Sequence, residues 1–528
     1  MRDLHFPGRS VVMSNHAMVA TSQPMATASA LQVLREGGNA MDAAVTAAAT
    51  LAVTEPQSTG LGGDCFILYH DNGTNFLYGL NGSGRAPTGA TYDAYVDRGY
   101  KGMPETGLHS SMVPGTVDAW VSALEKFGTK PLSTLLAPAI DYAENGFAVT
   151  PVVGQVWAKT ESRLARFPYS ARALLVNGKA PKVGSIHRQL DLADSLKLIA
   201  EHGADVFYRG PIAKEIVRYS KINDGFFELD DFAKHASTWV EPISADYRGL
   251  KVCELPPNGQ GVTALMILNI LEHVDFSKVD RLSAKHIHLF SEAYKLALIE
   301  RDMFVGDPEF NTVPTAQMLS KTFGESQYRR IDYSKALKHP IQSGLGPKET
   351  VYISVVDAAR NCASFINSTC HNWGSGVVAG RSGVVLQNRA VCFTLQKGHP
   401  NCVAPGKRAM HTIIPAMVYS DSRPILCFGV MGGHYQPMGH AYVLSNWFDY
   451  GLDLQESVDA PRFQPIEHKL GIERGIDESV RSVLREMGHE LEIQDAPFGG
   501  AQCIFIDWEN DVLQASSEPR KDGCALGY

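Results

Sequence analysis

Hydrophobic and polar positions alternate along this chain in two different ways. Apolar residues recur at helical intervals over residues 25–36 and again over 284–304, which predicts two helices. The first pattern stops at Gly37-Gly38, as expected of a helix C-terminal cap. Beyond residue 350 the pattern favours strands, with further candidates at 376–391 and 423–430. This mixture predicts an α/β (α+β) protein.

The sharpest change of pattern falls at Thr350. Residues 338–349 are rich in charge, glycine and proline, which is typical of an exposed segment. Residues 351–356 are β-branched or aromatic apart from Ser354, and a polar turn at 357–361 separates them from a second apolar run at 362–366, which together predict a hairpin. Thr350 therefore either simply begins a strand or, if the preceding peptide bond is cut, becomes a hydroxyl nucleophile. The freed α-amine, with a pKa of roughly 7.7–8.0, could then act as its base.

Segments spread along nearly the whole chain resemble the γ-glutamyltransferase family of N-terminal-nucleophile hydrolases, and they occur in that family's order. The N-terminal segments are Gly37-Gly38-Asn39-Ala40-Met41-Asp42, Glu55-Pro56, Gly60-Leu61-Gly62-Gly63, Val113-Pro114-Gly115 and Glu144-Asn145-Gly146. The later ones are Glu292-Ala293-Tyr294-Lys295, Arg301-Asp302, Gly306-Asp307-Pro308, the run from Thr350 to Asp357, Gly374-Ser375-Gly376 and Gly432-Gly433.

The resemblance implies a four-layer αββα sandwich that is built from one precursor. Self-cleavage between Glu349 and Thr350 would give a large (α) subunit, residues 1–349, and a small (β) subunit, residues 350–528, which together form one compact domain. Neither a cofactor nor a metal is expected. Further pairing of such heterodimers stays open.

The resemblance also assigns catalytic roles. Thr350 would attack first its own preceding carbonyl and then the amide of the substrate. Ser368 stands where the family has a hydroxyl that hydrogen-bonds the nucleophile's α-amino group, and Gly432 and Gly433 match its oxyanion-hole glycines. Without the resemblance, the glycine pair would equally suit a tight turn after a strand.

The departures from the family pattern concern the substrate. The transferase arginine that grips the substrate α-carboxylate is displaced by two positions to Arg85, and Ser83 takes its place. The positions that bind the α-amino and α-carboxylate groups are Cys370, Arg389 and Cys392. Because a thiol cannot accept hydrogen bonds from an ammonium as a carboxylate does, the γ-glutamyl amino group loses its anchor.

The remaining pocket candidates favour an anion without an ammonium. Within the family, the pattern is similar to the amidohydrolase and acylase branch, above all to oxamate amidohydrolases, which form oxalate and ammonia. Oxamate joins an amide directly to a carboxylate, a group that an arginine fork can bind. The substrate-binding candidates are Arg85, His411, Thr412, His434, Tyr435, Gln436 and Arg389.

Four alternatives remain. Two are enzymes of the same type, a γ-glutamyl peptide (glutathione-type) hydrolase or transferase and a glutaryl-type acylase with a wider pocket. The third is a non-catalytic scaffold relative. In the fourth, Gly259-Gln260-Gly261 with Ala264 matches a dinucleotide-binding fingerprint, but Pro256-Pro257 interrupts the approach and no carboxylate closes a second strand.

Composition narrows the partners and the compartment. The net charge of −8 gives no sustained basic surface, so nucleic acid is not an expected partner. The N-terminus lacks the apolar core of a secretory signal, and the apolar stretch 43–53 is too short to span a bilayer. Nine cysteines without a Cys-x-x-Cys pair fit reduced thiols. A cytoplasmic enzyme that acts on a small-molecule amide is the expectation.

Overall fold

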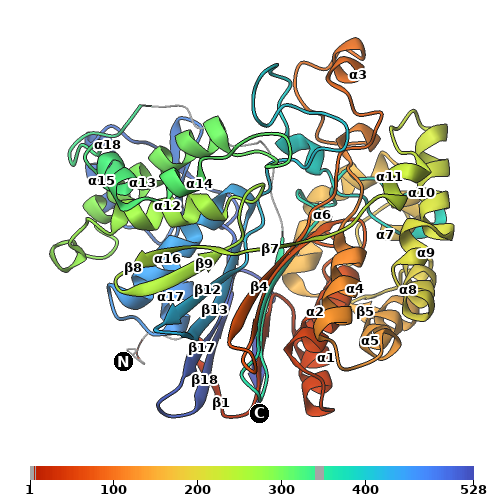
Figure 1. Cartoon of the computed structure of the whole chain (residues 1–528), viewed down its shortest axis with the longest axis horizontal. Coiled ribbons are helices and arrows are strands. Elements are labelled where there is room, and N and C mark those ends of the chain that lie inside the picture. The colour runs from red at the N-terminus through yellow and green to blue at the C-terminus, as the bar shows by residue number, and fades with distance from the viewer. Residues whose placement is uncertain (1–4, 6–7, 339–349) are drawn as a thin grey trace.

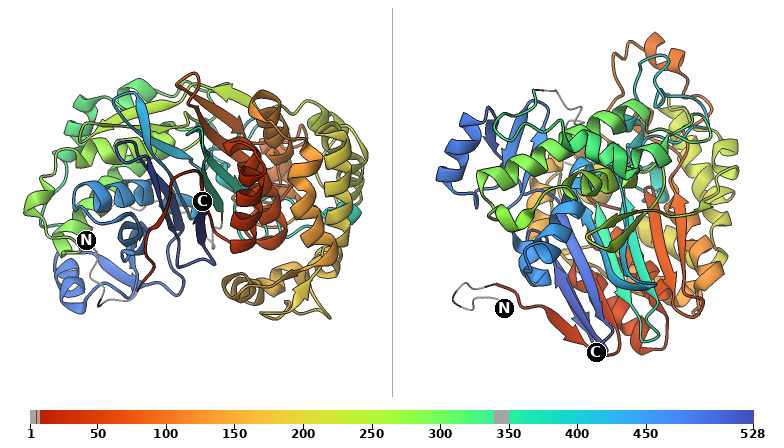
Figure 2. Two further views of the ribbon diagram at one scale, coloured as in Figure 1. Left: turned by 90° about the horizontal axis from the view of Figure 1, so that it is seen from below. Right: turned by 60° about the vertical axis from the view of Figure 1, so that its left-hand side comes forward.

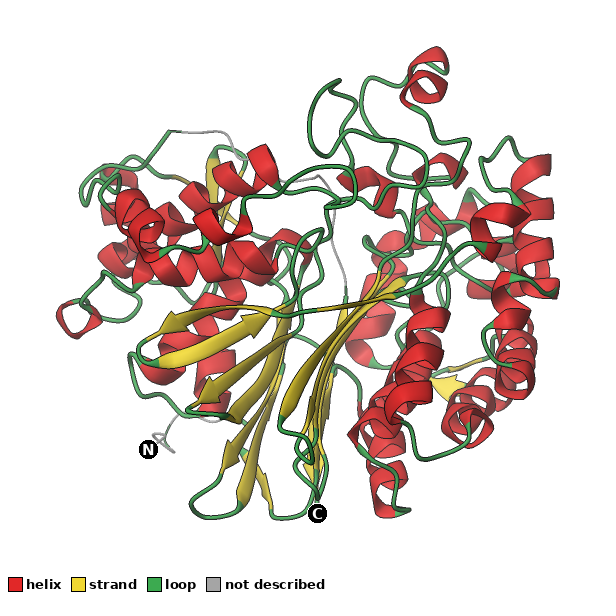
Figure 3. Ribbon diagram, viewed as in Figure 1, coloured by secondary structure: helices red, strands yellow, loops and turns green. Residues whose placement is uncertain are grey.

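A computed structural model describes residue 5, residues 8–338 and residues 350–528. Two seven-stranded sheets lie face to face at its centre (Figure 1, Figure 3). The first sheet has the strand order β19 (Cys524–Gly527), β2 (Met18–Thr21), β10 (Val351–Val356), β11 (Cys362–Ser368), β3 (Asp64–Asp71), β4 (Phe76–Gly82), β7 (Thr238–Val240).

The second sheet is also antiparallel throughout. Its order is β1 (Val12–Ser14), β18 (Val512–Ser517), β17 (Gly500–Asp507), β13 (Arg423–Met431), β12 (Ala416–Ser420), β9 (Leu250–Glu254), β8 (Ile243–Tyr247). Two smaller sheets are formed by β14 (Phe463–Ile466), β15 (Lys469–Ile472) and β16 (Glu490–Ile493), and by β5 (Phe147–Ala148) and β6 (Ile186–His187).

Helices cover the outer face of each sheet, which confirms the four-layer αββα prediction (Figure 2). Against the first sheet pack α1 (Pro24–Arg35), α2 (Ala40–Thr54) and α4 (Thr116–Phe127), with α5 (Leu132–Asn145) and α8 (Leu190–His202) outside them. Against the second lie α12 (Gly261–Leu271), α16 (Gln436–Phe448) and α17 (Leu454–Asp459), with α13 (Ala284–Phe304) beyond.

The other helices lie around these layers. They are α3 (Tyr92–Asp97), α6 (Pro151–Ala165), α7 (Pro168–Leu174), α9 (Asp205–Tyr208), α10 (Pro211–Ile222), α11 (Leu229–Ala233), α14 (Thr315–Met318), α15 (Lys321–Tyr328) and α18 (Glu478–Glu486).

Strand β10 is apolar at every position except Ser354, whose hydroxyl donates to the Cys427 carbonyl at 2.9 Å. All six of its residues are buried, because one face packs on α2 and the other on the second sheet. Tyr352 on the inner face lies in the core between the sheets, with Phe66, Met417 and Ile504. A strand buried on both faces gains from a hydrophobic residue at every position.

Most of the predicted elements are confirmed. The helices predicted over 25–36 and 284–304 are α1 and α13, the hairpin is β10 and β11, and 423–430 falls within β13. The strand predicted over 376–391 is wrong. That stretch is a buried loop with short 3-10 turns, because Gly376, Gly380 and Gly383 take positive φ angles of 79°, 63° and 67°, which interrupt an extended chain.

The structure bears on the cysteines, on membrane-spanning helices and on the segment before Thr350. All nine cysteines are free thiols. Within the described ranges, no helix is both long and apolar enough to cross a membrane. Of the segment 338–349, for which the sequence predicts exposure, residues 339–349 lie outside the described part, and these include Glu349 of the predicted cleavage site.

Candidate active site

Three polar residues lie in a row across neighbouring strands of the first sheet. Val351 pairs with Asn367, and continuing this antiparallel register places Thr350 opposite Ser368. Ser368 in turn pairs with Asp64 at the start of β3. Because neighbouring strands lie about 4.8 Å apart, this row places two buried hydroxyls and a buried carboxylate side by side at the ends of three central strands.

The hydroxyl groups of Thr350 and Ser368 form a hydrogen bond. Their oxygens are 3.1 Å apart, and the Thr350 side chain is buried. The Cys370 backbone N–H donates to the Ser368 Oγ at 2.9 Å. Ser368 thus has an oriented hydroxyl that can donate to Thr350 Oγ1 or accept from it. The hydrogen bond that the resemblance implies, from Ser368 to the α-amine freed by cleavage, stays a prediction.

Gly432 and Gly433 form a sharp turn between β13 and α16. Their φ angles are +112° and +60°, and a Cβ on Gly432 would lie 2.7 Å from the Cα of Gly499. Any other residue would be strained there. Helix α16 begins at Gln436, shortly after this turn, so the positive end of the helix dipole lies beside it.

Arg389, Asp64 and His411 form a fully buried polar cluster beside this row. Arg389 donates to Asp64 Oδ2 through Nε at 3.3 Å and to Thr412 Oγ1 through Nη1 at 2.8 Å. His411 Nε2 lies 3.1 Å from the same carboxylate oxygen, and the Gly84 N–H donates to the other oxygen at 2.8 Å. Among the described residues, Nη2 of Arg389 has no hydrogen-bond partner.

The charge states in this cluster follow from its contacts. Burial, and after it the nearby Arg389 charge, outweigh the raising effect of Asp64 and lower the pKa of His411 to about 4, so the ring is neutral at pH 7. Its Nδ1 accepts from the Ile413 N–H, which leaves the proton on Nε2 facing Asp64. Burial alone would raise the pKa of Asp64, but the His411 hydrogen bond, the Arg389 charge and the Gly84 N–H together lower it. Asp64 is therefore an anion.

Arg85 points to other carboxylates. Its Nη2 is 2.5 Å from Glu309, Nη1 donates to the Gly406 carbonyl at 3.0 Å, and Nη1 lies 3.7 Å from Asp307. Ser83, which stands in the transferase arginine's position, instead donates to Asn81 Oδ1 at 2.7 Å. Of the two candidate arginines, only Arg389 contacts the row of Thr350, Ser368 and Asp64, through its hydrogen bond to Asp64.

His434, Tyr435 and Gln436 support the glycine turn. His434 Nδ1 is 2.8 Å from Arg301 Nη1, and its carbonyl accepts from the Tyr294 hydroxyl at 2.8 Å. The buried Tyr435 ring stacks on Phe498. The Gln436 Oε1 accepts from the Ile414 N–H at 2.9 Å, next to the His411-Thr412 loop. Through these contacts the three residues stabilise the turn, and a role in binding substrate remains a prediction.

Cys370 and Cys392 both lie at the site. Cys370 is buried with a φ of +81°, and its N–H binds Ser368 as described above. The Cys392 sulfur is 3.8 Å from Arg389 Nη1. The two positions that carry polar anchors in transferases are therefore thiols close to the buried guanidinium.

One group of residues outside this site has metal-ligand chemistry. His288, Glu292 and His489 are buried with their ligand atoms within 4.8 Å of one another. However, His288 Nδ1 and His489 Nε2 already share a hydrogen bond of 2.9 Å, and Lys295 binds Glu292 at 2.8 Å. Since the ammonium would repel a cation, we interpret the group as a polar network that joins α13 to the α18–β16 loop.

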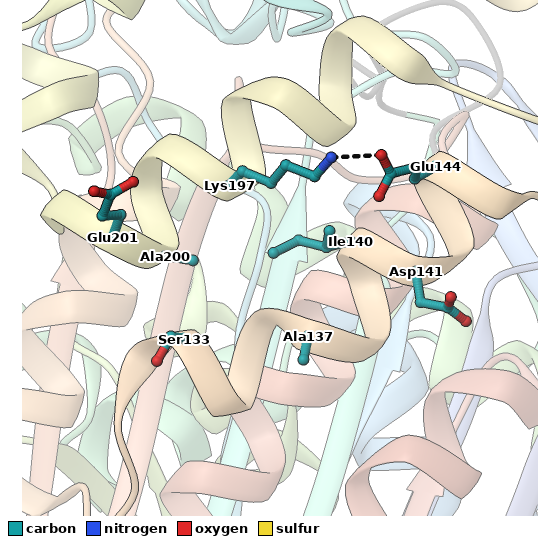
Figure 4. Close-up of a pocket in the computed structure, with 8 residues that line it drawn as sticks. All are labelled: Ser133, Ala137, Ile140, Asp141, Glu144, Lys197, Ala200 and Glu201. Atoms are coloured by element: carbon teal, nitrogen blue, oxygen red, sulfur yellow. Dashed lines mark hydrogen bonds and ion pairs between the residues drawn. The ribbon is translucent and has the colours of Figure 1, made fainter.

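A surface groove lies between α5 and α8, away from the row (Figure 4). It is lined by Ser133, Ala137, Ile140, Asp141, Glu144, Lys197, Ala200 and Glu201, and Lys197 pairs with Glu144 at 2.6 Å. None of the predicted site residues lines it. The groove is therefore a separate surface feature.

Asp64 is the main site residue that the sequence did not single out. It directly follows Gly60-Leu61-Gly62-Gly63, a segment that contributed to the family resemblance. A lone acid after a glycine-rich turn is too common a pattern to indicate a buried ion pair. Only the register of β3 with β11 brings it beside Thr350 and Ser368.

The two stacked sheets with helices on both outer faces are the fold of N-terminal-nucleophile hydrolases, and the relatives of this chain identify it as an enzyme that hydrolyses amides. The Gamma-glutamyltranspeptidase family profile matches residues 26–528, and the chain belongs to that family. The chain is 37% identical over 527 residues to the Glutathione hydrolase-like YwrD proenzyme of Bacillus subtilis (strain 168), covering 98% of this chain and 99% of that one.

Two further relatives are named for other substrates. The Oxamate amidohydrolase proenzyme of Klebsiella pneumoniae is 34% identical over 532 residues, covering 98% of this chain and 99% of the relative. The crystal structure of cephalosporin acylase from Bacillus halodurans superposes with a TM-score of 0.93 at 38% identity, over 99% of this chain and 98% of that one. The family and the amide chemistry are thus confirmed, while these relatives carry three different substrate names.

Proposed function

We propose that this protein is a self-processing amidohydrolase with Thr350 as nucleophile, acting on a small amide that bears a carboxylate. Its precursor is cut between Glu349 and Thr350, giving subunits of residues 1–349 and 350–528. The proenzyme names of the curated relatives support a processed precursor. No nucleic acid, membrane or cofactor enters this proposal, and the cytoplasm is the proposed compartment.

The proposed chemistry uses an acyl-enzyme. After processing, the α-amine of Thr350 takes the hydroxyl proton, and Oγ1 attacks the amide carbon. Ser368, 3.1 Å from Oγ1, holds the hydroxyl in place. Backbone N–H groups at Gly432 and Gly433 stabilise the oxyanion, ammonia or an amine leaves with a proton, and water then hydrolyses the ester.

The observation that carries the substrate class is the state of Arg389. Its side chain is 0% exposed, and Nη2 has no partner among the described residues. A buried N–H donor without an acceptor costs roughly 1–3 kcal/mol, which a bound carboxylate would recover. Asp64 is already occupied by Arg389, His411 and Gly84, so it has little capacity left to receive a substrate ammonium.

Oxamate fits this arrangement best. It presents one carboxylate and no amine, and the carboxylate is bonded directly to the amide carbon that Thr350 attacks. Arg389, with His411 and Thr412 in the same cluster, would bind the carboxylate. The similarity over 98% of the chain to an oxamate amidohydrolase supports this choice. The products would be oxalate and ammonia.

The test is ammonia release from oxamate by purified protein, alongside hydrolysis of a γ-glutamyl anilide and of a glutaryl amide. The proposal predicts turnover of oxamate with the highest kcat/KM of the three. Thr350→Ala should abolish turnover, a loss on the order of 10⁴-fold or more, whereas Thr350→Ser should retain part of it. Turnover of the γ-glutamyl anilide alone would overturn the oxamate assignment.

The glutaryl-type acylase is the second candidate, because the cephalosporin acylase structure superposes over 99% of this chain. A glutaryl group also ends in a carboxylate without an amine, so Arg389 could bind it in a longer pocket. Preferred hydrolysis of the glutaryl amide would favour this candidate. A scaffold would hydrolyse none of the three substrates.

A further inference from the structure

The segment Gly259-Gln260-Gly261, which resembles a nucleotide fingerprint, lies against the His411-Thr412 loop. It joins β9 to α12, and a Cβ on Gly261 would lie 2.6 Å from the Leu255 carbonyl oxygen. The His411 N–H donates to the Asn258 carbonyl at 2.8 Å, and the Gln260 N–H donates to the His411 carbonyl at 3.0 Å. This short parallel pairing fixes the backbone of the His411-Thr412 loop.

The side chain of Gln260 reaches a second loop as well. Its Nε2 donates to the Thr412 carbonyl at 2.7 Å and to the Gly433 carbonyl at 2.9 Å, and the side chain is 0% exposed. One amide nitrogen therefore uses its two hydrogens to connect the loop beside Arg389 to the glycine turn. The amide oxygen, Oε1, accepts from Arg301 Nη1 at 2.9 Å. Donor and acceptor needs of this amide are met with one orientation.

Arg301 holds the glutamine and the turn together. The same Nη1 that binds Gln260 lies 2.8 Å from His434 Nδ1, and Asp302 binds the guanidinium at 2.6 Å. The Arg301 side chain is buried at the end of α13. The glycine turn thus has two supports from one arginine, through Gln260 and through His434.

We propose that Gln260 is a positioning residue: it sets the distance between the His411-Thr412 loop, which contacts Arg389, and the Gly432-Gly433 turn. Arg301 holds Gln260 in place. This inference rests on the proposed function. In oxamate the carboxylate and the attacked carbon share a bond, so the substrate has no flexible linker that could absorb an error between the two loops. Misplacement by about 1 Å can cost on the order of 10²-fold in rate.

A longer substrate should respond differently. In a glutaryl or γ-glutamyl amide, several rotatable bonds separate the carboxylate from the reacting carbon, and these can adjust to a shifted loop. Loss of Gln260 should therefore lower turnover of the shortest substrate most. A residue that merely stabilised the fold would reduce the activity towards all substrates by the same factor.

The experiment compares Gln260→Leu with the wild type on oxamate and on a glutaryl amide. We expect kcat/KM for oxamate to fall about 10–100-fold, and for the glutaryl amide by less than about 5-fold. Gln502→Leu is the matched control: Gln502 is buried in β17, and its amide has no partner among the described residues. That variant should keep wild-type kinetics.

A double variant tests the role of Arg301. If Arg301 acts through Gln260, Arg301→Met should cost less in the Gln260→Leu background than in the wild type. Gln260→Leu with unchanged kcat/KM, or with equal losses on both amides, would overturn the inference. If the wild type cleaves no amide at all, the proposed function has failed. If the wild type cleaves only the longer amide, the oxamate assignment has failed and the positioning role falls with it, whereas an unchanged Gln260→Leu variant of a wild type that cleaves oxamate overturns the positioning role alone.

Discussion

Arg462 and Arg389 are both buried and paired with buried acids, and they differ in whether all of their N–H groups have an acceptor. Arg462 is 1% exposed: its Nη1 donates to the Phe498 carbonyl at 2.6 Å, and its Nη2 donates to Glu518 at 2.5 Å and to the Val458 carbonyl at 3.0 Å. Arg389 is equally buried, but its Nη2 has no acceptor within the described part of the chain.

This difference separates a structural ion pair from a binding site. Both arginines sit beside an ionised carboxylate, since contacts with cations lower the pKa of Glu518, as they do for Asp64, despite burial. Burial and pairing alone therefore do not indicate function. An unused donor, placed beside the row of Thr350 and Ser368, is what distinguishes Arg389.

The largest effect should come from replacing each arginine by methionine. Arg389→Met should lower kcat/KM for oxamate on the order of 10²–10³-fold, because the substrate carboxylate loses its cation. Arg462→Met should lower the free energy of unfolding by about 3–5 kcal/mol, because Glu518 then stays buried with less compensation, and leave KM unchanged. Kinetics per folded molecule and urea unfolding check both. A similar rise in KM for the two variants would remove the distinction.

The second prediction concerns pH, because the Arg389 cluster contains a histidine. The pKa of His411 in the folded protein, about 4, lies below its ordinary 6.5, so the unfolded chain binds more protons between these values. The stability from neutral His411 is complete above about pH 6.5 and is lost as the pH falls towards 4, up to roughly 3 kcal/mol.

His411→Asn should therefore flatten the pH dependence of unfolding between about pH 6.5 and 4. Urea unfolding at several pH values measures this, and the variant should take up about one proton fewer on unfolding. Other buried histidines, such as His286 and His440, keep the remaining slope, since burial lowers the pKa of each to about 3. An unchanged slope would show that His411 is already charged in the folded protein.

A conservative exchange sharpens the comparison further. Arg389→Lys keeps the charge but loses the planar fork, so KM for oxamate should rise about 10–30-fold with a smaller change in kcat. Arg462→Lys should alter Tm and leave KM as it is. Steady-state kinetics with thermal unfolding of both variants checks this, and an unaltered KM for Arg389→Lys would argue against binding of the carboxylate by the guanidinium.

The smallest effect is expected at Thr412, whose hydroxyl accepts from Arg389 Nη1 at 2.8 Å. Thr412→Val removes one hydrogen bond that aims the guanidinium, worth about 1 kcal/mol, so KM should rise about 3–5-fold. Thr263→Val is a matched control in α12, since its buried hydroxyl has no partner among the described residues. Equal changes in the two variants would show that the effect is not specific to the pocket.

The sequence predicted those parts of the molecule whose pattern is local. Residues 284–304 have helical periodicity, and β10 is apolar at every position but Ser354, so both were recognisable. The strand predicted over 376–391 failed because glycines with positive φ bend an apolar stretch into a loop, and composition does not reveal φ.

The candidate site was predicted as far as the family resemblance reaches. Thr350, Ser368 and the glycine pair were named, and the first two are hydrogen-bonded. The choice between Arg85 and Arg389 could not be made, because it depends on which carboxylates each one meets in space. Asp307 and Glu309 meet Arg85, whereas Asp64 meets Arg389 from a strand 325 positions away in the chain.

The central claim is that Thr350 becomes an N-terminal nucleophile, and intact-mass analysis of the purified protein tests it most directly. The account predicts two fragments with the masses of residues 1–349 and 350–528, and one uncut chain for Thr350→Ala. An uncut wild-type chain that still hydrolyses an amide, or two such fragments from Thr350→Ala, would contradict it.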